Sequence, residues 1–132
     1  MSALSFEITT TNHLLVELQI NNHPCHFLID TGASASCIER TLVETLLLTT
    51  SAFEHEMSSA NATFDQPIIT EEVELRGNDW NHHSALIAID LSTVNGSLSP
   101  LGISYVSGII GTDILSEREA IIDFKQKVLL FP

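Results

Sequence analysis

The sequence context of one carboxylate, that of Asp30, is suited to catalysis. Asp30 ends the apolar run 27–29 and is followed by Thr31, Gly32 and Ala33. A buried strand would fix the carboxylate at the floor of a cleft. The glycine would let the backbone turn and approach a substrate, and the threonine would tie the loop down by hydrogen bonds. The same tripeptide also fits an ordinary strand that ends in a solvated Asp-Thr-Gly turn, and taken alone it favours that simpler interpretation.

A second segment, residues 106–115, has a related build. An apolar strand leads into Gly111, after which Thr112 or Asp113 could cap the first turn of a helix. By itself this segment fits a simple strand-to-helix joint.

Together the two segments resemble those of the retropepsin family, the aspartic proteases of retroviruses and their cellular and bacterial relatives. That family carries an apolar-apolar-Asp-Thr/Ser-Gly-Ala loop, matched at 28–33, and a later apolar-apolar-Gly-x-Asp/Asn-apolar-Leu element, matched at 109–115. Order, spacing and length agree over residues 14–131. The resemblance implies one all-β domain over residues 1–132, with a closed, curved, barrel-like acid-protease fold and one or two short helices.

The resemblance also implies a cofactor-free aspartic endopeptidase that acts on peptide or protein substrates as a homodimer. Aspartic proteolysis needs two carboxylates, but the chain has a single Asp-Thr-Gly, so a symmetric dimer would place Asp30 beside its own copy. Two carboxylates about 3 Å apart repel by about 5 kcal/mol at an effective dielectric of about 20, so the pair would hold one proton. Asp30 is then catalytic, Thr31 and Gly32 shape its loop, and Gly32 and Ala33 border the substrate backbone.

Relatives close their cleft with a glycine-rich hairpin, the flap. By position the flap falls near residues 57–63, which predicts substrate contacts from Met57, Ser58, Ser59, Ala60 and Asn61. Because this segment lacks glycine, we expect it to be stiffer than a retroviral flap. The departure supports an alternative function, a non-catalytic dimerisation or peptide-binding module that keeps the protease fold. A protease that cuts only its own precursor is a further alternative.

Other departures concern the second motif and the C-terminus. Retroviral enzymes usually pair an acidic residue just after Asp-Thr-Gly-Ala with an arginine after the second-motif glycine, where this chain has Ser34 and Thr112. Both members of that ion pair are missing, so neither charge is left without its partner. Gly111, Thr112 and Asp113 are therefore expected to act as a structural second motif. The C-terminal pattern predicts a hairpin, which looks more like the cellular and bacterial relatives than the retroviral enzymes.

Short apolar runs separated by turn residues must position these segments, and they are typical of an all-β fold. Ser36 is a plausible N-cap for a helix over about 38–48, and a short helix is expected near 113–118. Turns are expected at 21–24 and 77–79, and a surface loop at 92–104. The expected strands cover 6–8, 14–20, 25–29, 68–75, 85–91, 120–124 and 127–131.

Composition argues against several other kinds of site. Seventeen acidic against five basic residues give a formal net charge of -12, which disfavours nucleic acid as a partner. Cys25 and Cys37 form neither a disulfide framework nor a CxxC site, and the six histidines lack ligand spacing, so no metal is expected. Ser34 and Ser36 lack convincing partners for nucleophilic catalysis. The glycines at 108 and 111 lack the lysine and the spacing of a phosphate-binding loop.

The N-terminal residues have neither a basic region nor a long apolar run. The sequence therefore predicts no signal peptide, no membrane span and a cytoplasmic location.

Overall fold

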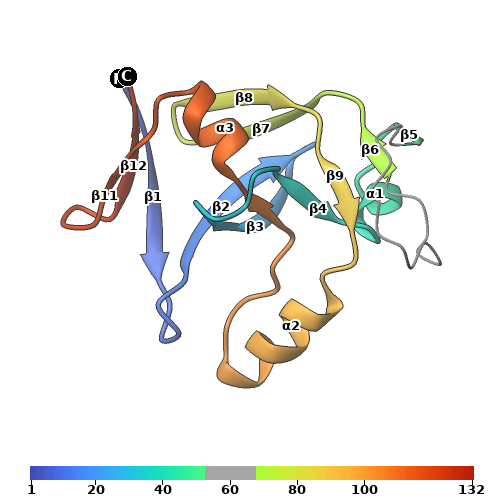
Figure 1. The fold of residues 1–132 in the computed structure, drawn as a ribbon, viewed down its shortest axis with the longest axis horizontal. Coiled ribbons are helices and arrows are strands. Elements are labelled where there is room, and N and C mark those ends of the chain that lie inside the picture. Colours follow the sequence, from blue (N-terminus) through green and yellow to red (C-terminus); the bar gives the residue numbers. More distant parts are fainter. Residues whose placement is uncertain (53–67) are drawn as a thin grey trace.

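Strands make up most of the fold, with a few short helices at its margins (Figure 1). The computed structural model describes residues 1–52 and 68–132. The strands are β1 (Ser2–Ile8), β2 (Leu14–Ile20), β3 (His23–Ile29), β4 (Cys37–Glu39), β5 (Thr50–Ala52), β6 (Ile68–Thr70), β7 (Val73–Gly77), β8 (Trp80–Ser84), β9 (Ile87–Ile89), β10 (Gly108–Ile110), β11 (Ile121–Asp123) and β12 (Val128–Phe131). The helices are α1 (Leu42–Thr45), α2 (Ser92–Leu98), the 3-10 turn η1 (Ser99–Leu101) and α3 (Thr112–Glu117).

The strands form one curved sheet in the order β11-β12-β1-β2-β3-β10-β4-β9-β6-β5, with β7 pairing with β2 and β8. The predicted all-β fold class is thereby confirmed. The sheet is not closed, however, because β11 and β5 lie on opposite sides of the molecule and do not pair (Figure 1). A closed barrel requires its first and last strands to meet.

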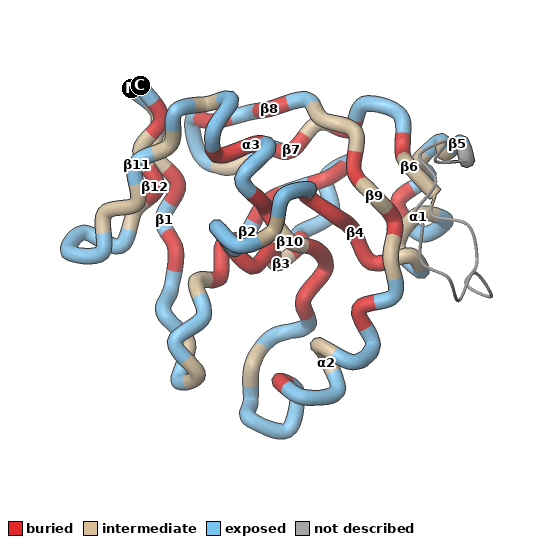
Figure 2. Tube along the Cα trace, viewed as in Figure 1, coloured by how far each residue is buried: buried red, intermediate tan, exposed pale blue. Residues whose placement is uncertain are grey.

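Both faces of the central strands are buried, which gives the molecule two apolar clusters (Figure 2). Side chains alternate along a strand, so neighbouring residues of β2 and β3 enter different clusters. Phe27 lies in the larger cluster, which fills the concave side of the sheet, whereas Leu28 lies in the smaller one. The smaller cluster consists of Leu15, Leu28, Cys37, Leu91, Leu98 and Val106 and packs beneath α2.

Several sequence-based predictions for local structure are wrong. The helix expected over 38–48 is instead strand β4 followed by the single turn α1. The apolar residue Ile38 is fully buried between β9 and β10, so burial in the sheet outweighs the helical spacing of the apolar residues that follow it. The loop expected at 92–104 contains α2 and η1, so the described residues hold three α-helices and one 3-10 turn rather than one or two helices.

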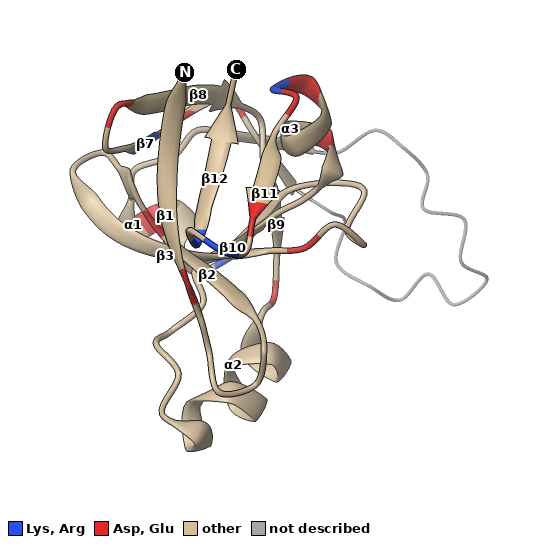
Figure 3. Ribbon diagram, turned by 90° about the vertical axis from the view of Figure 1, so that its left-hand side faces the viewer, with Lys and Arg blue, Asp and Glu red and all other residues tan. Residues whose placement is uncertain are grey.

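The strand expected at 68–75 is divided into β6 and β7, and β8 was not predicted. Several other predictions for local structure are confirmed. Asn78, at φ 46°, forms the turn between β7 and β8, α3 begins at Thr112, and β11 and β12 form the C-terminal hairpin. That hairpin joins the N-terminal strand through the pairing of β12 with β1, which brings the two termini side by side (Figure 1). Acidic residues outnumber basic ones by 17 to 5 in the sequence, and Figure 3 marks the positions of both kinds along the described chain. No helix in the described ranges is both long and apolar enough to span a membrane.

Candidate active site

Asp30 lies at the point where β3 leaves the sheet, with its side chain exposed. β3 pairs in parallel with β10, and the backbone N–H of Asp30 extends that ladder by donating to the carbonyl of Ile110 at 2.9 Å. Ile29, the preceding residue, is buried. The backbone of Asp30 is therefore fixed by the sheet while its carboxylate faces outward.

The loop after Asp30 turns tightly around the carboxylate. The N–H of Gly32 donates to Asp30 Oδ1 at 2.8 Å, and the N–H of Ala33 donates to the Asp30 carbonyl at 3.1 Å. A Cβ at Gly32 would lie 3.1 Å from Oδ1 of Asp30, closer than a side chain normally approaches. Glycine thus lets the backbone donate to the carboxylate at close range.

The second motif fixes this loop by hydrogen bonds. Thr112 makes two contacts: its N–H donates to the Ala33 carbonyl at 2.7 Å, and its Oγ1 donates to the Thr31 carbonyl at 2.8 Å. Gly111 allows the approach, since a Cβ there would lie 2.6 Å from the Ala33 carbonyl oxygen. The position that holds an arginine in retroviral enzymes is therefore occupied by a neutral side chain that ties down the same loop.

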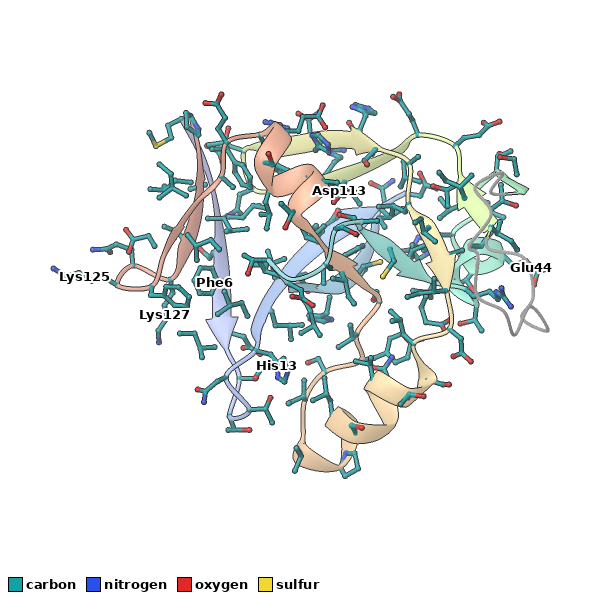
Figure 4. The ribbon with its side chains drawn as sticks, viewed as in Figure 1. Phe6, His13, Glu44, Asp113, Lys125 and Lys127 are labelled. Carbon is teal, nitrogen blue, oxygen red and sulfur yellow. The ribbon has the colours of Figure 1, made fainter. Side chains whose placement is uncertain are left out.

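The buried side chain of Ser36 adds a third hydrogen-bonded connection, or tie, between the loop and the second motif. Asp113, labelled in Figure 4 at the start of α3, accepts from the N–H of Ser36 at 2.9 Å and from Ser36 Oγ at 2.7 Å. Ser36 Oγ in turn accepts from the N–H of Gly111 at 2.9 Å. The sequence predicted Ser36 as a helix N-cap, which is wrong, because its hydroxyl lies between the two motifs. Ser36 and Asp113 are far apart in the sequence, so no local sequence pattern predicts their contact.

All the residues predicted for the loop and the second motif therefore come together in one place. These residues are Asp30, Thr31, Gly32, Ala33, Gly111, Thr112 and Asp113. The predicted flap contacts, Met57, Ser58, Ser59, Ala60 and Asn61, lie outside the described residues.

A cleft of about 600 Å³ opens beside the carboxylate. Its floor is apolar and comes from β3 and β10, while one wall is α2 and the opposite wall is the turn between β1 and β2. The cleft is lined by Asn12, His13, Leu14, Leu28, Ile29, Asp30, Thr93, Val94, Ser97, Leu98 and Ile109. Sequence reasoning missed both walls, since polar turn residues and a helix poor in helix-forming residues give no functional pattern.

Two side chains anchor the α2 wall. Asn95 imitates a paired strand: its Nδ2 donates to the Val106 carbonyl at 3.0 Å, and its Oδ1 accepts from the Val106 N–H at 2.7 Å. Glu39 is buried at the end of β4 and accepts from the Leu91 N–H at 3.1 Å, just before α2. Thr41 also donates to Glu39 through its N–H and its hydroxyl.

Burial would raise the pKa of Glu39, but the hydrogen bonds from Thr41 and Leu91 outweigh it and hold the pKa below its usual value. A charged acceptor therefore sits where β4, α1 and α2 meet.

The described residues offer no cluster of His, Cys, Asp or Glu suited to a metal ion. Burial raises the pKa of the Cys37 thiol to about 11, which keeps it protonated and unreactive near neutral pH. Within the described cleft, the ionisable side chains are Asp30 and His13.

The comparisons with known proteins agree with this geometry. The sequence model of a family described as "gag-polyprotein putative aspartyl protease" matches residues 16–117. None of the curated protein sequences compared with the chain matches it.

Several solved structures share the fold. The retroviral protease-like domain of Ddi1 from Leishmania major superposes with a TM-score of 0.61 at 18% identity, covering 95% of this chain and 90% of that one. A retropepsin-like aspartic protease from Rickettsia conorii gives 0.57 at 13% identity, covering 97% and 86%. The EIAV protease in complex with the inhibitor HBY-793 gives 0.55 at 17% identity, covering 83% and 91%.

Proposed function

The chain belongs to the gag-polyprotein aspartyl protease family, and from that premise we propose that it is an aspartic endopeptidase whose active site forms between two copies. Asp30 of each copy supplies one of the two catalytic carboxylates. The observation that carries the proposal is the exposed Asp30 carboxylate beside an apolar cleft, on a loop held by three ties to the second motif.

The chemistry follows from two carboxylates placed close together. Their repulsion makes the pair hold a single proton. The ionised carboxylate takes a proton from a bound water, whose oxygen attacks the peptide carbonyl carbon, while the protonated carboxylate gives its proton to the carbonyl oxygen. The tetrahedral intermediate then breaks its C–N bond as the leaving nitrogen receives a proton from the pair. The Gly32 N–H, which donates to Asp30 Oδ1 at 2.8 Å, helps to hold the carboxylate in one orientation.

The homodimer is the second part of the proposal. Asp30 is the single aspartate of the sequence in an Asp-Thr-Gly context, so one chain supplies half of the catalytic pair. The exposed position of the Asp30 loop supports contact with a second copy, and twofold symmetry would bring the two loops together.

Peptide-library cleavage from acidic to neutral pH tests the chemistry, with Asp30→Asn as the control. The substitution keeps the shape and removes the shared proton, so cleavage should fall by about 10³-fold or more while the circular dichroism spectrum is unchanged. Full activity in Asp30→Asn would overturn the assignment.

Dilution tests the assembly. Activity per chain should fall as the concentration drops through the dimer dissociation constant. Constant specific activity in a sample that sediments as a monomer would contradict a shared site.

A further inference from the structure

The cleft combines an apolar floor with one polar side chain at its far wall. Leu28 and Ile109 form the floor and Leu98 of α2 borders it. His13 faces them from the turn between β1 and β2, and Figure 4 shows it in the space between that turn and α2. A cleft of this kind can bind the aliphatic part of a substrate side chain along its floor. The polar residue at the wall then selects for the group at the end of that side chain.

A chain of hydroxyl groups holds the His13 ring in place. Its Nδ1 lies 2.7 Å from Thr11 Oγ1, which lies 2.8 Å from Thr9 Oγ1. The backbone N–H of His13 also donates to Thr9 Oγ1, at 3.0 Å, which completes a ring of hydrogen bonds. The turn itself is fixed by the Thr9 N–H, which donates to the His13 carbonyl at 2.9 Å. Two threonine side chains, at positions 9 and 11, thus orient the His13 imidazole.

The direction of donation along these hydroxyls decides which ring nitrogen of His13 carries the hydrogen. Thr9 Oγ1 accepts from the His13 backbone, and it can donate to Thr11, which can donate to Nδ1 of the ring. In this arrangement Nδ1 is an acceptor and the neutral ring carries its hydrogen on Nε2. If the ring is protonated, Nε2 keeps that hydrogen. His13 therefore presents an N–H donor from Nε2, and no hydrogen-bond partner occupies it among the described residues.

On the basis of the proposed function, we propose that His13 is a specificity residue that selects substrates with a glutamine side chain near the scissile bond. The two methylenes of glutamine fit the apolar floor and its carbonyl oxygen accepts from Nε2. Glutamate has the same length, but its charge meets Asp30 in the same cleft and a chain of formal net charge -12. Methionine has a similar shape and lacks the strong acceptor.

Binding of uncleavable peptides provides the test. In these peptides a hydroxyethylene group replaces the scissile bond, and Gln or Met is placed in turn at each flanking position. At one position the wild-type protein should bind the Gln peptide about 3- to 10-fold more tightly than the Met peptide, as expected for one neutral hydrogen bond. His13→Leu should abolish this ratio by removing the donor to the Gln side chain.

His23→Leu is the matched control, since His23 is exposed at the start of β3 and lies outside the cleft. It should leave the ratio unchanged. Equal affinities for Gln and Met at every position, the same ratio in His13→Leu, or no peptide binding at all would each overturn the proposal.

A second experiment measures the tautomer of the His13 ring directly. Imidazole ¹⁵N chemical shifts should show the Nε2–H tautomer of His13 in the wild type, with a shift of Nε2 when the Gln peptide binds. Thr11→Val removes the partner of Nδ1 and should give a mixture of tautomers and a smaller Gln-to-Met ratio. An unchanged tautomer in Thr11→Val would contradict the role of the hydroxyl chain.

Failure of this proposal is distinguishable from failure of the proposed function. Asp30-dependent cleavage without a preference for Gln would contradict only the role of His13. Gln-selective binding by a protein that cleaves nothing would contradict only the catalytic proposal.

Discussion

The loop around Asp30 and helix α2 border the same cleft, yet they are held in different ways. The loop is tied through its own backbone, at Thr31, Ala33 and Ser36, to a second motif that also begins a helix. By contrast, α2 is anchored by two side chains, Asn95 within it and Glu39 outside it. Backbone ties leave little freedom for sequence change, whereas side-chain anchors can be exchanged. The Asp30 side of the cleft is thus the constrained side, and the α2 wall is the adjustable one.

Breaking the tie between Ser36 and Asp113 should have the largest effect. Asp113→Ala removes a charged acceptor from the N–H and hydroxyl of buried Ser36, so the free energy of unfolding should fall by about 3 kcal/mol. Misplacement of the loop should also lower kcat by about 10²-fold.

Denaturant unfolding and peptide cleavage would measure both effects for Asp113. Ser116→Ala, on the exposed face of the same helix, should change neither. A wild-type kcat in folded Asp113→Ala would show that the loop does not depend on this tie.

Removing the charge of Glu39 tests the other side of the cleft. Glu39→Gln should lower the free energy of unfolding by about 2 kcal/mol at neutral pH, because the carboxylate accepts three hydrogen bonds. The pKa of Glu39 is lower in the folded state than in the unfolded chain. Its stabilisation is therefore present above the unfolded pKa, near 4.5, and is lost as the pH falls through the folded value.

Urea unfolding at several pH values between 7 and 3 would follow this loss. The matched variant Glu44→Gln, exposed on α1 (Figure 4), should keep the wild-type pH dependence. If Glu39→Gln keeps it too, another carboxylate is responsible.

Loosening α2 should alter substrate binding more than chemistry. Asn95→Ala leaves the N–H and carbonyl of buried Val106 without their partner, which should cost about 1–2 kcal/mol. We expect KM to rise several-fold with kcat nearly unchanged, since no tie of the Asp30 loop is touched. Gly96→Ala is the neighbouring control: nothing lies within 4 Å of its added Cβ, so it should stabilise the helix slightly. A fall in kcat without a change in KM would contradict the distinction between the Asp30 loop and α2.

The smallest expected effect concerns the far end of α3. His82 is buried, stacks on Trp80 at 5.8 Å, and its Nδ1 lies 3.1 Å from Nη1 of Arg118. Burial, and then the charge of Arg118, lower the pKa of His82. Its stabilising contribution is present above the unfolded pKa, near 6.5, and is lost as the pH falls toward the folded value.

The free energy of unfolding should accordingly fall slightly as the pH drops from 7 to 5. His82→Gln should flatten this slope, and His83→Gln, exposed on the same strand, should not. Identical slopes in all three proteins would exclude His82 as the source.

The constrained side of the cleft was predictable from sequence and the adjustable side was not. An apolar strand ending in Asp30 and a glycine before Thr112 are local patterns, so the loop, β3, β10 and α3 were all predicted. The tie between Ser36 and Asp113 depends on a contact between distant positions, which no local pattern reports.

Helix α2 was missed for a physical reason. Its serine, threonine, asparagine and glycine residues are poor helix formers, so its sequence reads as a loop. Burial of Leu98 and the pairing of Asn95 with Val106 supply the stability that propensity does not. The strand at Cys37–Glu39 was missed because three residues are too short to show alternation, and the apolar residues after it have helical spacing.

The parallel pairing of β3 with β10 has a consequence for the order in which the protein is made. These strands are neighbours in the sheet but far apart in the chain, and such contacts form late because a long loop must first be closed. On the ribosome, Asp30 emerges long before Thr112 and Asp113, the residues that fix its loop. A nascent chain therefore carries Asp30 on an unsupported loop until most of the domain has been translated. The proposed active site can form only after the second motif has been made.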